Sequence, residues 1–145
     1  MKKTNNKGFS LVELIIVIAI MAILIGVLAP QYIKYVERSR VSNDKDMIDS
    51  LTKAAQTAVT DDDYYDKLTA GTDKIEISDS GVDVTGDGMQ AAIQEFYGSV
   101  ANNKFKSKAF AGATVEISLV QDSTTNVLKV EVKDGNGTYD PANYK

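Results

Sequence analysis

A nearly uninterrupted apolar run near the amino terminus constrains this chain more than any other feature. The 22 residues from Phe9 to Pro30 carry one charged side chain, Glu13, and Leu14 to Ala29 contain no polar side chain. At about 1.5 Å per residue, a helix of this length spans roughly 33 Å, close to the hydrocarbon thickness of a bilayer. Because the run is apolar on every side, it predicts a segment that meets lipid or lies buried in an assembly.

The flanks of the run argue that it is a retained helix. Lys2, Lys3 and Lys7 precede it, which predicts a cytoplasmic amino terminus and export of the rest of the chain. An ordinary secretory signal peptide has a shorter apolar region, about 7–15 residues, without an internal acid. Its small-residue cleavage site would end at Ala29, directly before Pro30, where cleavage is unfavourable. Hydropathy alone leaves a generic single-span anchor open.

The composition excludes several kinds of functional site. The chain has no histidine and no cysteine, so Cys/His zinc sites, thiol nucleophiles, histidine bases and disulfides are ruled out. The net charge of -4 argues against a nucleic-acid partner, which requires clustered Lys and Arg. No convincing nucleophile–base pair is evident. We therefore expect no enzyme activity, no cofactor and no metal site.

The start of the chain resembles the amino-terminal signal of a known protein family. The stretch KGFSLVELIIVIAIMAILIGVLAPQY resembles the class III signal of type IV pilins, with a short basic leader, a glycine before the cut and an N-methylated phenylalanine. A glutamate four residues later and a long apolar helix complete the pattern. The corresponding residues here are Lys2, Lys3, Lys7, Gly8, Phe9, Glu13 and the run from Leu14 to Ala29. The motif covers about the first 35 residues, and the remainder can be compared only in architecture.

The resemblance implies roles for individual residues. A prepilin peptidase would cut between Gly8 and Phe9 and methylate the new amino group of Phe9. Glu13 would pair with that amino group on a neighbouring subunit and so set the axial register. From the residues alone, Glu13 is equally a carboxylate tolerated near the membrane edge, where the cost is below the 2.5–3.5 kcal/mol of mid-bilayer. The helix is expected to break or loosen between Gly26 and Pro30 on assembly; the alternative is a modest kink.

Beyond the apolar run, the sequence predicts an α+β protein with a long helical spine and a small antiparallel sheet. The expected parts are a leader at 1–8, a hydrophobic helix at 9–30, its amphipathic continuation at 31–60 and a globular head at 61–145. Helical spacing of Met47, Ile48 and Leu51 supports the continuation. Alternating apolar residues predict strands. These strands are Lys74–Ser78, Gly81–Thr85, Thr114–Val120 and Val127–Lys133.

Several polar segments beyond the apolar run have ordinary structural interpretations. Residues 37–46 are predicted to be solvated, or to meet neighbouring subunits by charge, and the aspartates of Thr60–Asp73 read as a solvated loop. Asp87 is the expected N-cap of a helix, with Gln90 as its capping-box partner. That helix should bury an apolar stripe. The stripe consists of Met89, Ile93, Phe96 and Val100.

The sequence thus predicts a structural subunit of a type IV pilus. Its expected partners are copies of itself, prepilin peptidase, the cytoplasmic membrane, the pilus assembly machinery and minor pilins. It would begin as a single-pass membrane prepilin and end in an extracellular filament with roles in adhesion or motility. The alternatives are a pseudopilin or minor pilin of a secretion or DNA-uptake machine, and a membrane-anchored extracellular binding module. The missing cysteines favour a Gram-positive source.

Overall fold

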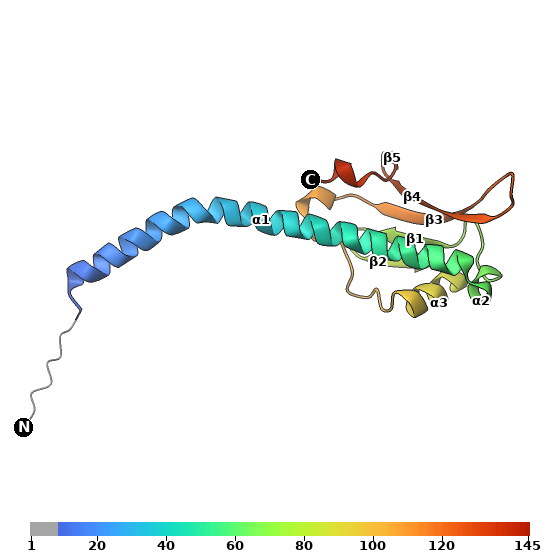
Figure 1. The fold of residues 1–145 in the computed structure, drawn as a ribbon, viewed down its shortest axis with the longest axis horizontal. Coiled ribbons are helices and arrows are strands. Elements are labelled where there is room, and N and C mark those ends of the chain that lie inside the picture. Colours follow the sequence, from blue (N-terminus) through green and yellow to red (C-terminus); the bar gives the residue numbers. More distant parts are fainter. Residues whose placement is uncertain (1–8) are drawn as a thin grey trace, which may run out of the picture. The chain divides into compact units, whose positions relative to one another are not determined.

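The structure, a computed structural model, describes residues 9–145, and its fold is drawn in Figure 1. The helices are α1 (Leu11–Thr60), α2 (Asp62–Tyr65) and α3 (Asp87–Phe96). The strands are β1 (Lys74–Ile77), β2 (Val82–Thr85), β3 (Val115–Gln121), β4 (Leu128–Asp134) and β5 (Gly137–Thr138). Two short 3-10 helices are η1 (Lys108–Phe110) and η2 (Pro141–Asn143). Packing divides the described chain after Val36 into an amino-terminal unit and a head that begins at Glu37.

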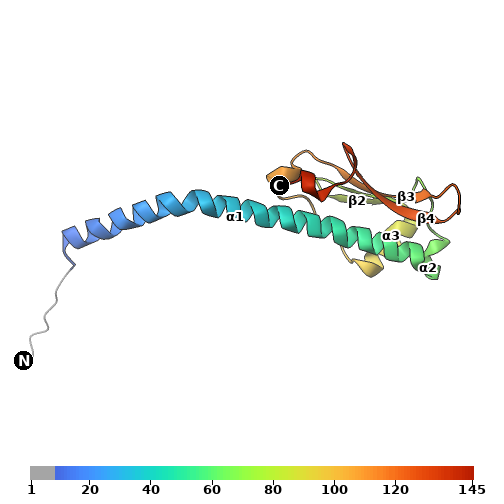
Figure 2. The ribbon, with the colours of Figure 1, turned by 45° about the horizontal axis from the view of Figure 1, so that its top comes forward.

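Helix α1 reaches Thr60, as its apolar spacing predicts. From Glu37 onward, one face of α1 packs into the head, and the sheet lies along this part of the helix (Figures 1 and 2). Three alanines on that face leave room for close approach of neighbouring side chains. The buried residues of α1 are Val41, Asp44, Ile48, Leu51, Ala54, Ala55 and Ala58.

The sheet has five strands in the order β2-β1-β3-β4-β5, and every neighbouring pair is antiparallel. Its inward face places Ile75 opposite both Val84 and Ile117. Because side chains alternate along a strand, these residues bury one apolar face against the helices. The predicted α+β architecture with an antiparallel sheet is therefore confirmed.

The prediction that residues 37–46 are simply solvated is wrong at Asp44. Its side chain is 2% exposed, and its carboxylate accepts hydrogen bonds from the backbone N–H groups of Lys106 and Ser107. Glu37 lies seven residues, or about two turns, before Asp44 on the same face of α1, and it accepts from the N–H of Lys108. The two acids therefore hold the 106–108 segment against α1. Their partners lie more than 60 residues away in the sequence, so local polarity does not reveal them.

The predicted N-cap of α3 is also wrong. Gly86 occupies the cap position with φ of 91°, and Asp73 supplies the side-chain acceptor, 3.1 Å from the backbone nitrogen of Met89. A Cβ atom on Gly86 would stand 1.9 Å from the Asp73 carboxylate, so glycine also makes room for this cap. Gln90 does not complete a capping box; its Nε2 donates to the carbonyl of Val84 at 2.9 Å.

The predicted apolar stripe of α3 is only partly buried. Met89 and Ile93 lie in the core, whereas Phe96 is half-buried and Val100 lies beyond the end of the helix. The preceding 60–73 segment is not wholly a loop either. It forms the single-turn helix α2, whose cap Asp61 accepts from the backbone N–H of Asp63.

Aromatic packing holds the carboxy-terminal end of a chain that has no cysteine. The Tyr144 ring stacks on Phe110 with ring centroids 4.0 Å apart, and Phe110 stacks in turn on Phe105 at 4.5 Å. The Tyr144 hydroxyl donates to Asp134 at 2.9 Å, which joins the end of the chain to strand β4. Burial, followed by the hydrogen bond to Asp134, raises the pKa of Tyr144. Stacked rings thus perform the fixing role that a disulfide performs in other small domains.

Candidate functional site

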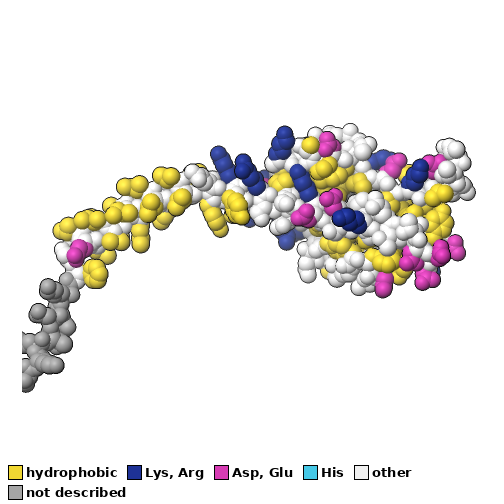
Figure 3. Space-filling model, viewed as in Figure 1, with side chains coloured by type: hydrophobic (Ala, Val, Ile, Leu, Met, Phe, Trp, Pro, Cys, Tyr) yellow, Lys and Arg dark blue, Asp and Glu magenta, His cyan; other side chains and the backbone are white. Residues whose placement is uncertain are grey.

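The amino-terminal half of α1 presents apolar side chains to its surroundings along its whole length. Every residue from Phe9 to Tyr35 is exposed, and the large apolar side chains of Leu11–Tyr35 are between 45% and 73% exposed. Figure 3 shows this surface as an almost unbroken run of hydrophobic side chains. Within residues 9–145, α1 is the one helix long and apolar enough to cross a membrane. Such a surface requires lipid or other helices as its environment.

The single acid of this segment is held at the start of the helix. The backbone N–H of Ser10 donates to Glu13 Oε2 at 2.9 Å, and the N–H of Val12 donates to the Ser10 hydroxyl at 3.3 Å. Ser followed three residues later by Glu is the capping-box pattern, in which side chains satisfy N–H groups left free at a helix start. Both side chains are exposed, and Glu13 also complements the positive end of the helix dipole.

This local role of Glu13 is one that the sequence reasoning missed. The spacing Ser10-x-x-Glu13 is itself a capping signature, so the sequence holds a local signal for this role. The hydrogen bond to Ser10 uses one carboxylate oxygen, Oε2. The carboxylate therefore has acceptor capacity beyond its own helix.

Phe9 lies just ahead of the helix and is 91% exposed. It is four residues from Glu13, so its backbone and the acid sit at the same end of α1. Gly8 and the three leader lysines lie outside the described residues. The predicted cleavage between Gly8 and Phe9 accordingly stays a prediction.

Helix α1 runs through Gly26 and Pro30 without interruption. The two residues are linked by the helical pattern, because an N–H at position 30 would bond the carbonyl at position 26. Proline lacks that N–H, so the carbonyl of Gly26 lacks its ordinary partner. A Cβ atom on Gly26 would meet no atom within 4 Å. Loosening of the helix between Gly26 and Pro30 on assembly stays a prediction.

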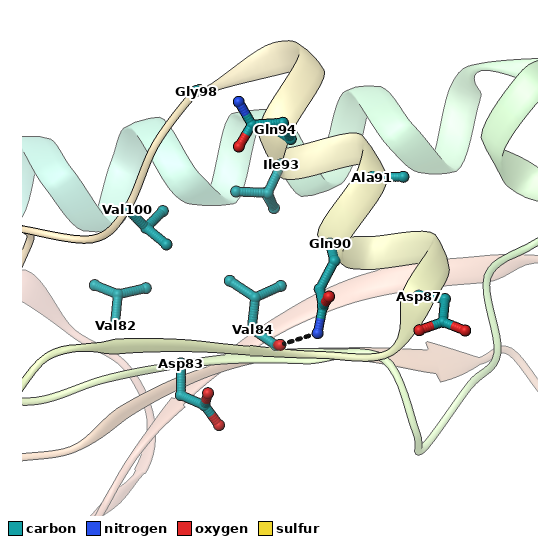
Figure 4. Close-up of a pocket in the computed structure, with 10 residues that line it drawn as sticks. All are labelled: Val82, Asp83, Val84, Asp87, Gln90, Ala91, Ile93, Gln94, Gly98 and Val100. Atoms are coloured by element: carbon teal, nitrogen blue, oxygen red, sulfur yellow. Dashed lines mark hydrogen bonds between the residues drawn. The ribbon is translucent and has the colours of Figure 1, made fainter.

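A cleft of about 630 Å³ lies between strand β2 and helix α3 (Figure 4). Val82, Val84 and Ile93 supply apolar walls, and Gln90 reaches across to the carbonyl of Val84. Asp83 and Asp87, the acids that line it, are exposed. Across residues 9–145, no group of three or more acids is placed to hold a metal ion. The cleft offers no nucleophile paired with a base, so the apolar helix is the better candidate for a functional element.

The first comparison with known proteins matches the start of the chain and the apolar part of α1. Residues 3–29 match the family model described as a prokaryotic N-terminal methylation motif. The matched residues include Phe9 and Glu13 and nearly the whole apolar run. The chain thus falls in the class of proteins that carry this motif at the start of an apolar helix.

Curated relatives narrow the class. The type IV major fimbrial protein FimA of Dichelobacter nodosus is 42% identical over 59 residues, which are 41% of this chain and 38% of that protein. The type IV major pilin protein PilA of Myxococcus xanthus (strain DK1622) is 38% identical over 61 residues, 42% of this chain and 28% of that protein. The chain therefore spans about a third of the length of these relatives. In its long amino-terminal helix and in these matches, the chain is similar to type IV pilins.

One further relative aligns over most of the chain. Prepilin peptidase-dependent protein A of Clostridium perfringens (strain 13 / Type A) is 23% identical over 124 residues, which cover 82% of this chain and 89% of that protein. No solved structure matches the chain. The two pilin alignments, over 59 and 61 residues, thus have the higher identity. The alignment with the Clostridium perfringens protein is longer and includes the head, at 23% identity.

Proposed function

We propose that this protein is a structural subunit of a type IV pilus. The observation that carries the proposal is the fully exposed apolar part of α1, with one carboxylate, Glu13, four residues after Phe9. Leaving such a surface in water is unfavourable, because removing apolar area from water lowers the free energy by about 25 cal/mol per Å². Packing this helix against copies of itself would cover the surface. Relatives named as major pilins support the same role.

Maturation would proceed at the start of the helix. Prepilin peptidase would cleave between Gly8 and Phe9 and methylate the amino group of Phe9. The cut leaves α1 intact, because the helix begins at Leu11. The shortened chain would stay in the cytoplasmic membrane through residues 9–30, with residues 31–60 continuing the spine and the globular part of residues 61–145 outside. The pilus assembly machinery would then draw it into the extracellular filament.

Glu13 would set the axial position of each subunit relative to its neighbour in the filament. Inside a filament core, the positive amino group of one subunit's Phe9 would neutralise the Glu13 carboxylate of its neighbour. A subunit in the wrong axial position would leave both charges buried and unpaired, which is strongly unfavourable. The hydrogen bond to Ser10 holds the carboxylate at the helix start while the other oxygen is free to accept from the neighbour. No catalytic role is proposed for any residue.

A pseudopilin or minor pilin of a secretion or DNA-uptake machine is the second candidate. It is favoured by the long alignment with a protein whose name records dependence on prepilin peptidase and does not mention a pilus. The same motif and helix would serve either machine. Isolation of surface filaments and identification of their main component separates the two. Long fibres built mainly of this chain support the pilus; their absence, with the chain retained in the membrane, contradicts it.

A further inference from the structure

Five exposed cations lie on the first turns of α1 within the head and on the segment that Glu37 and Asp44 hold against this part of the helix. Two come from α1, and three come from the segment that precedes and begins η1. We call them the basic collar: Arg38, Arg40, Lys104, Lys106 and Lys108. The structure buries Phe105 and Phe110 in the core, and so turns the lysines outward.

The acids nearest to the collar are used to build it. Asp44 is buried and bonds the backbone of Lys106 and Ser107, and Glu37 bonds the backbone of Lys108. Arg40 approaches Glu37 at 3.8 Å, whereas no ion pair in residues 9–145 involves Arg38 or the three lysines. Asp46 is exposed and lies about 200° around the helix from Asp44, away from the collar lysines. The collar therefore presents a net positive surface.

The other end of the head is acidic. Four aspartates, Asp61, Asp62, Asp63 and Asp66, lie in and beside helix α2. From Arg40 to Asp61, α1 rises about 32 Å at 1.5 Å per residue. That separation is about four times the Debye length of roughly 8 Å at physiological salt. The two ends therefore act as separate patches of opposite sign, and an anionic plane would attract the collar and repel the α2 end.

The basic collar begins a few residues after the apolar segment in the sequence. Arg38 follows Pro30 by eight residues, so even an extended chain would separate them by no more than about 28 Å. A shallow hollow of about 180 Å³ lies within the collar, lined by Arg40, Lys104 and Lys106 together with Tyr97 and Asn103. Asp44 also lines it, but this carboxylate is buried and accepts hydrogen bonds from the backbone N–H groups of Lys106 and Ser107. Three cations around one hollow suit a phosphate group, which accepts hydrogen bonds and carries negative charge.

We propose that the basic collar binds anionic phospholipid headgroups while the subunit is held in the membrane before assembly. The inference rests on the membrane stage of the proposed function and adds a lipid-binding surface to it. A bilayer is favoured over a second copy of the chain, because the collar adjoins the membrane-spanning segment in sequence and a bilayer places a plane of phosphates beside that segment's end. Binding to anionic lipid would hold the head down until assembly pulls the subunit out.

The test uses the full chain in lipid nanodiscs. The chain has no cysteine, so Asn102→Cys, at an exposed position beside the collar, gives a single site for a fluorescent donor. An acceptor dye on the lipid headgroups reports how closely the collar approaches the bilayer. Nanodiscs of phosphatidylcholine alone are compared with nanodiscs containing 30% phosphatidylglycerol, at 0.1 M and 0.5 M salt. We expect greater energy transfer with phosphatidylglycerol, and loss of the difference at high salt.

Charge-matched variants make the result specific. In Lys104→Gln/Lys106→Gln/Lys108→Gln, the gain in transfer that 30% phosphatidylglycerol produces should fall at least fivefold, since one cation at an anionic surface contributes about a fivefold change in binding. The control Lys53→Gln/Lys67→Gln/Lys129→Gln removes the same charge from exposed positions elsewhere and should respond like the unaltered chain. A matching unfolding midpoint for both triple variants confirms that each remains folded.

Three results would overturn the proposal. Equal transfer in the two lipid compositions removes lipid binding and leaves the proposed pilus function intact. A salt-sensitive self-association that the collar variant abolishes, without any response to phosphatidylglycerol, assigns the collar to contact with a second copy. Failure of the chain to insert into either bilayer contradicts the membrane stage of the proposed function, and the lipid-binding proposal falls with it.

Discussion

The carboxylate of Glu13 accepts a hydrogen bond from the backbone N–H of Ser10 at 2.9 Å, so the one acid of the apolar segment also caps its helix. The two roles can be separated because glutamine retains an acceptor oxygen and loses the charge. An acid that served only as a cap would be replaceable by glutamine. An acid that pairs with a neighbour's amino group would not.

We expect Glu13→Gln and Glu13→Ala to prevent filament formation equally. Each leaves the buried amino group of Phe9 unpaired in the filament, at a cost of about 3–5 kcal/mol per contact. Ser10→Ala is the matched control, since it removes the hydroxyl that accepts from the N–H of Val12, at about 1 kcal/mol, and keeps the charge of Glu13. Electron microscopy of surface filaments gives the yield. Normal filaments from Glu13→Gln would reduce Glu13 to a helix cap.

Replacing Asp44 should destabilise the head. Asp44→Ala leaves the N–H groups of Lys106 and Ser107 without their acceptor, and we expect the free energy of unfolding to fall by about 2–3 kcal/mol. The control is Asp46→Ala, which removes an exposed acid two positions along the same helix and should cost no more than about 0.5 kcal/mol. Denaturant unfolding of the full chain in detergent measures both. Equal effects would mean that Asp44 does not anchor the 106–108 segment.

Asp73 and Asp87 test which acid caps α3. Asp73→Ala loses the hydrogen bonds from the backbone N–H groups of Thr69 and Met89, so the free energy of unfolding should fall by about 2–3 kcal/mol. Asp87 lies in the first turn with an exposed side chain, and Asp87→Ala should cost about 0.3–1 kcal/mol through the helix dipole. Thermal unfolding of the two variants compares them. A larger loss at Asp87 would restore the sequence-based cap.

Tyr139 carries a buried hydroxyl without a hydrogen-bond partner in the described part of the chain. Tyr139→Phe removes that unsatisfied group, and we expect it to raise the free energy of unfolding at pH 7 by about 1 kcal/mol. Exposed Tyr32→Phe is the control and should leave stability unchanged. Urea unfolding at pH 7 makes the comparison. A loss of stability in Tyr139→Phe would show that the hydroxyl has a stabilising partner.

The same tyrosine predicts how stability depends on alkaline pH. Burial, reinforced by the charge of Asp49, raises the pKa of Tyr139 above its ordinary value of 10.0. Ionisation of this phenol therefore leaves stability unchanged below about pH 10, and above pH 10 stability falls as the unfolded chain releases the proton that the folded chain retains. Unfolding midpoints between pH 8 and 11.5 should fall above pH 10, and less steeply in Tyr139→Phe. Parallel curves for the two proteins would exclude Tyr139 as the cause.

The elements of this fold were predictable where the signal is local. The apolar run gave α1, and alternating residues gave β1 to β4 to within one or two positions. The Ser10–Glu13 cap is equally local, and the spacing Ser10-x-x-Glu13 is the signal that predicts it. Asp44 and Asp73 were not predictable, because their partners are distant in sequence and only folding shows that these acids are buried. The same holds for the stack of Phe110 on Tyr144, which brings together residues more than 30 positions apart.

The intact mass of the chain extracted from membranes or filaments tests the central claim most directly. If the protein is a processed type IV pilin, the mass will equal that of the chain from Phe9 to Lys145 with one added methyl group. Fragmentation should place that methyl group on the amino nitrogen of Phe9. A mass that includes the first eight residues, Met1 to Gly8, would contradict the account, because an unprocessed leader provides no amino group at Phe9 to pair with Glu13.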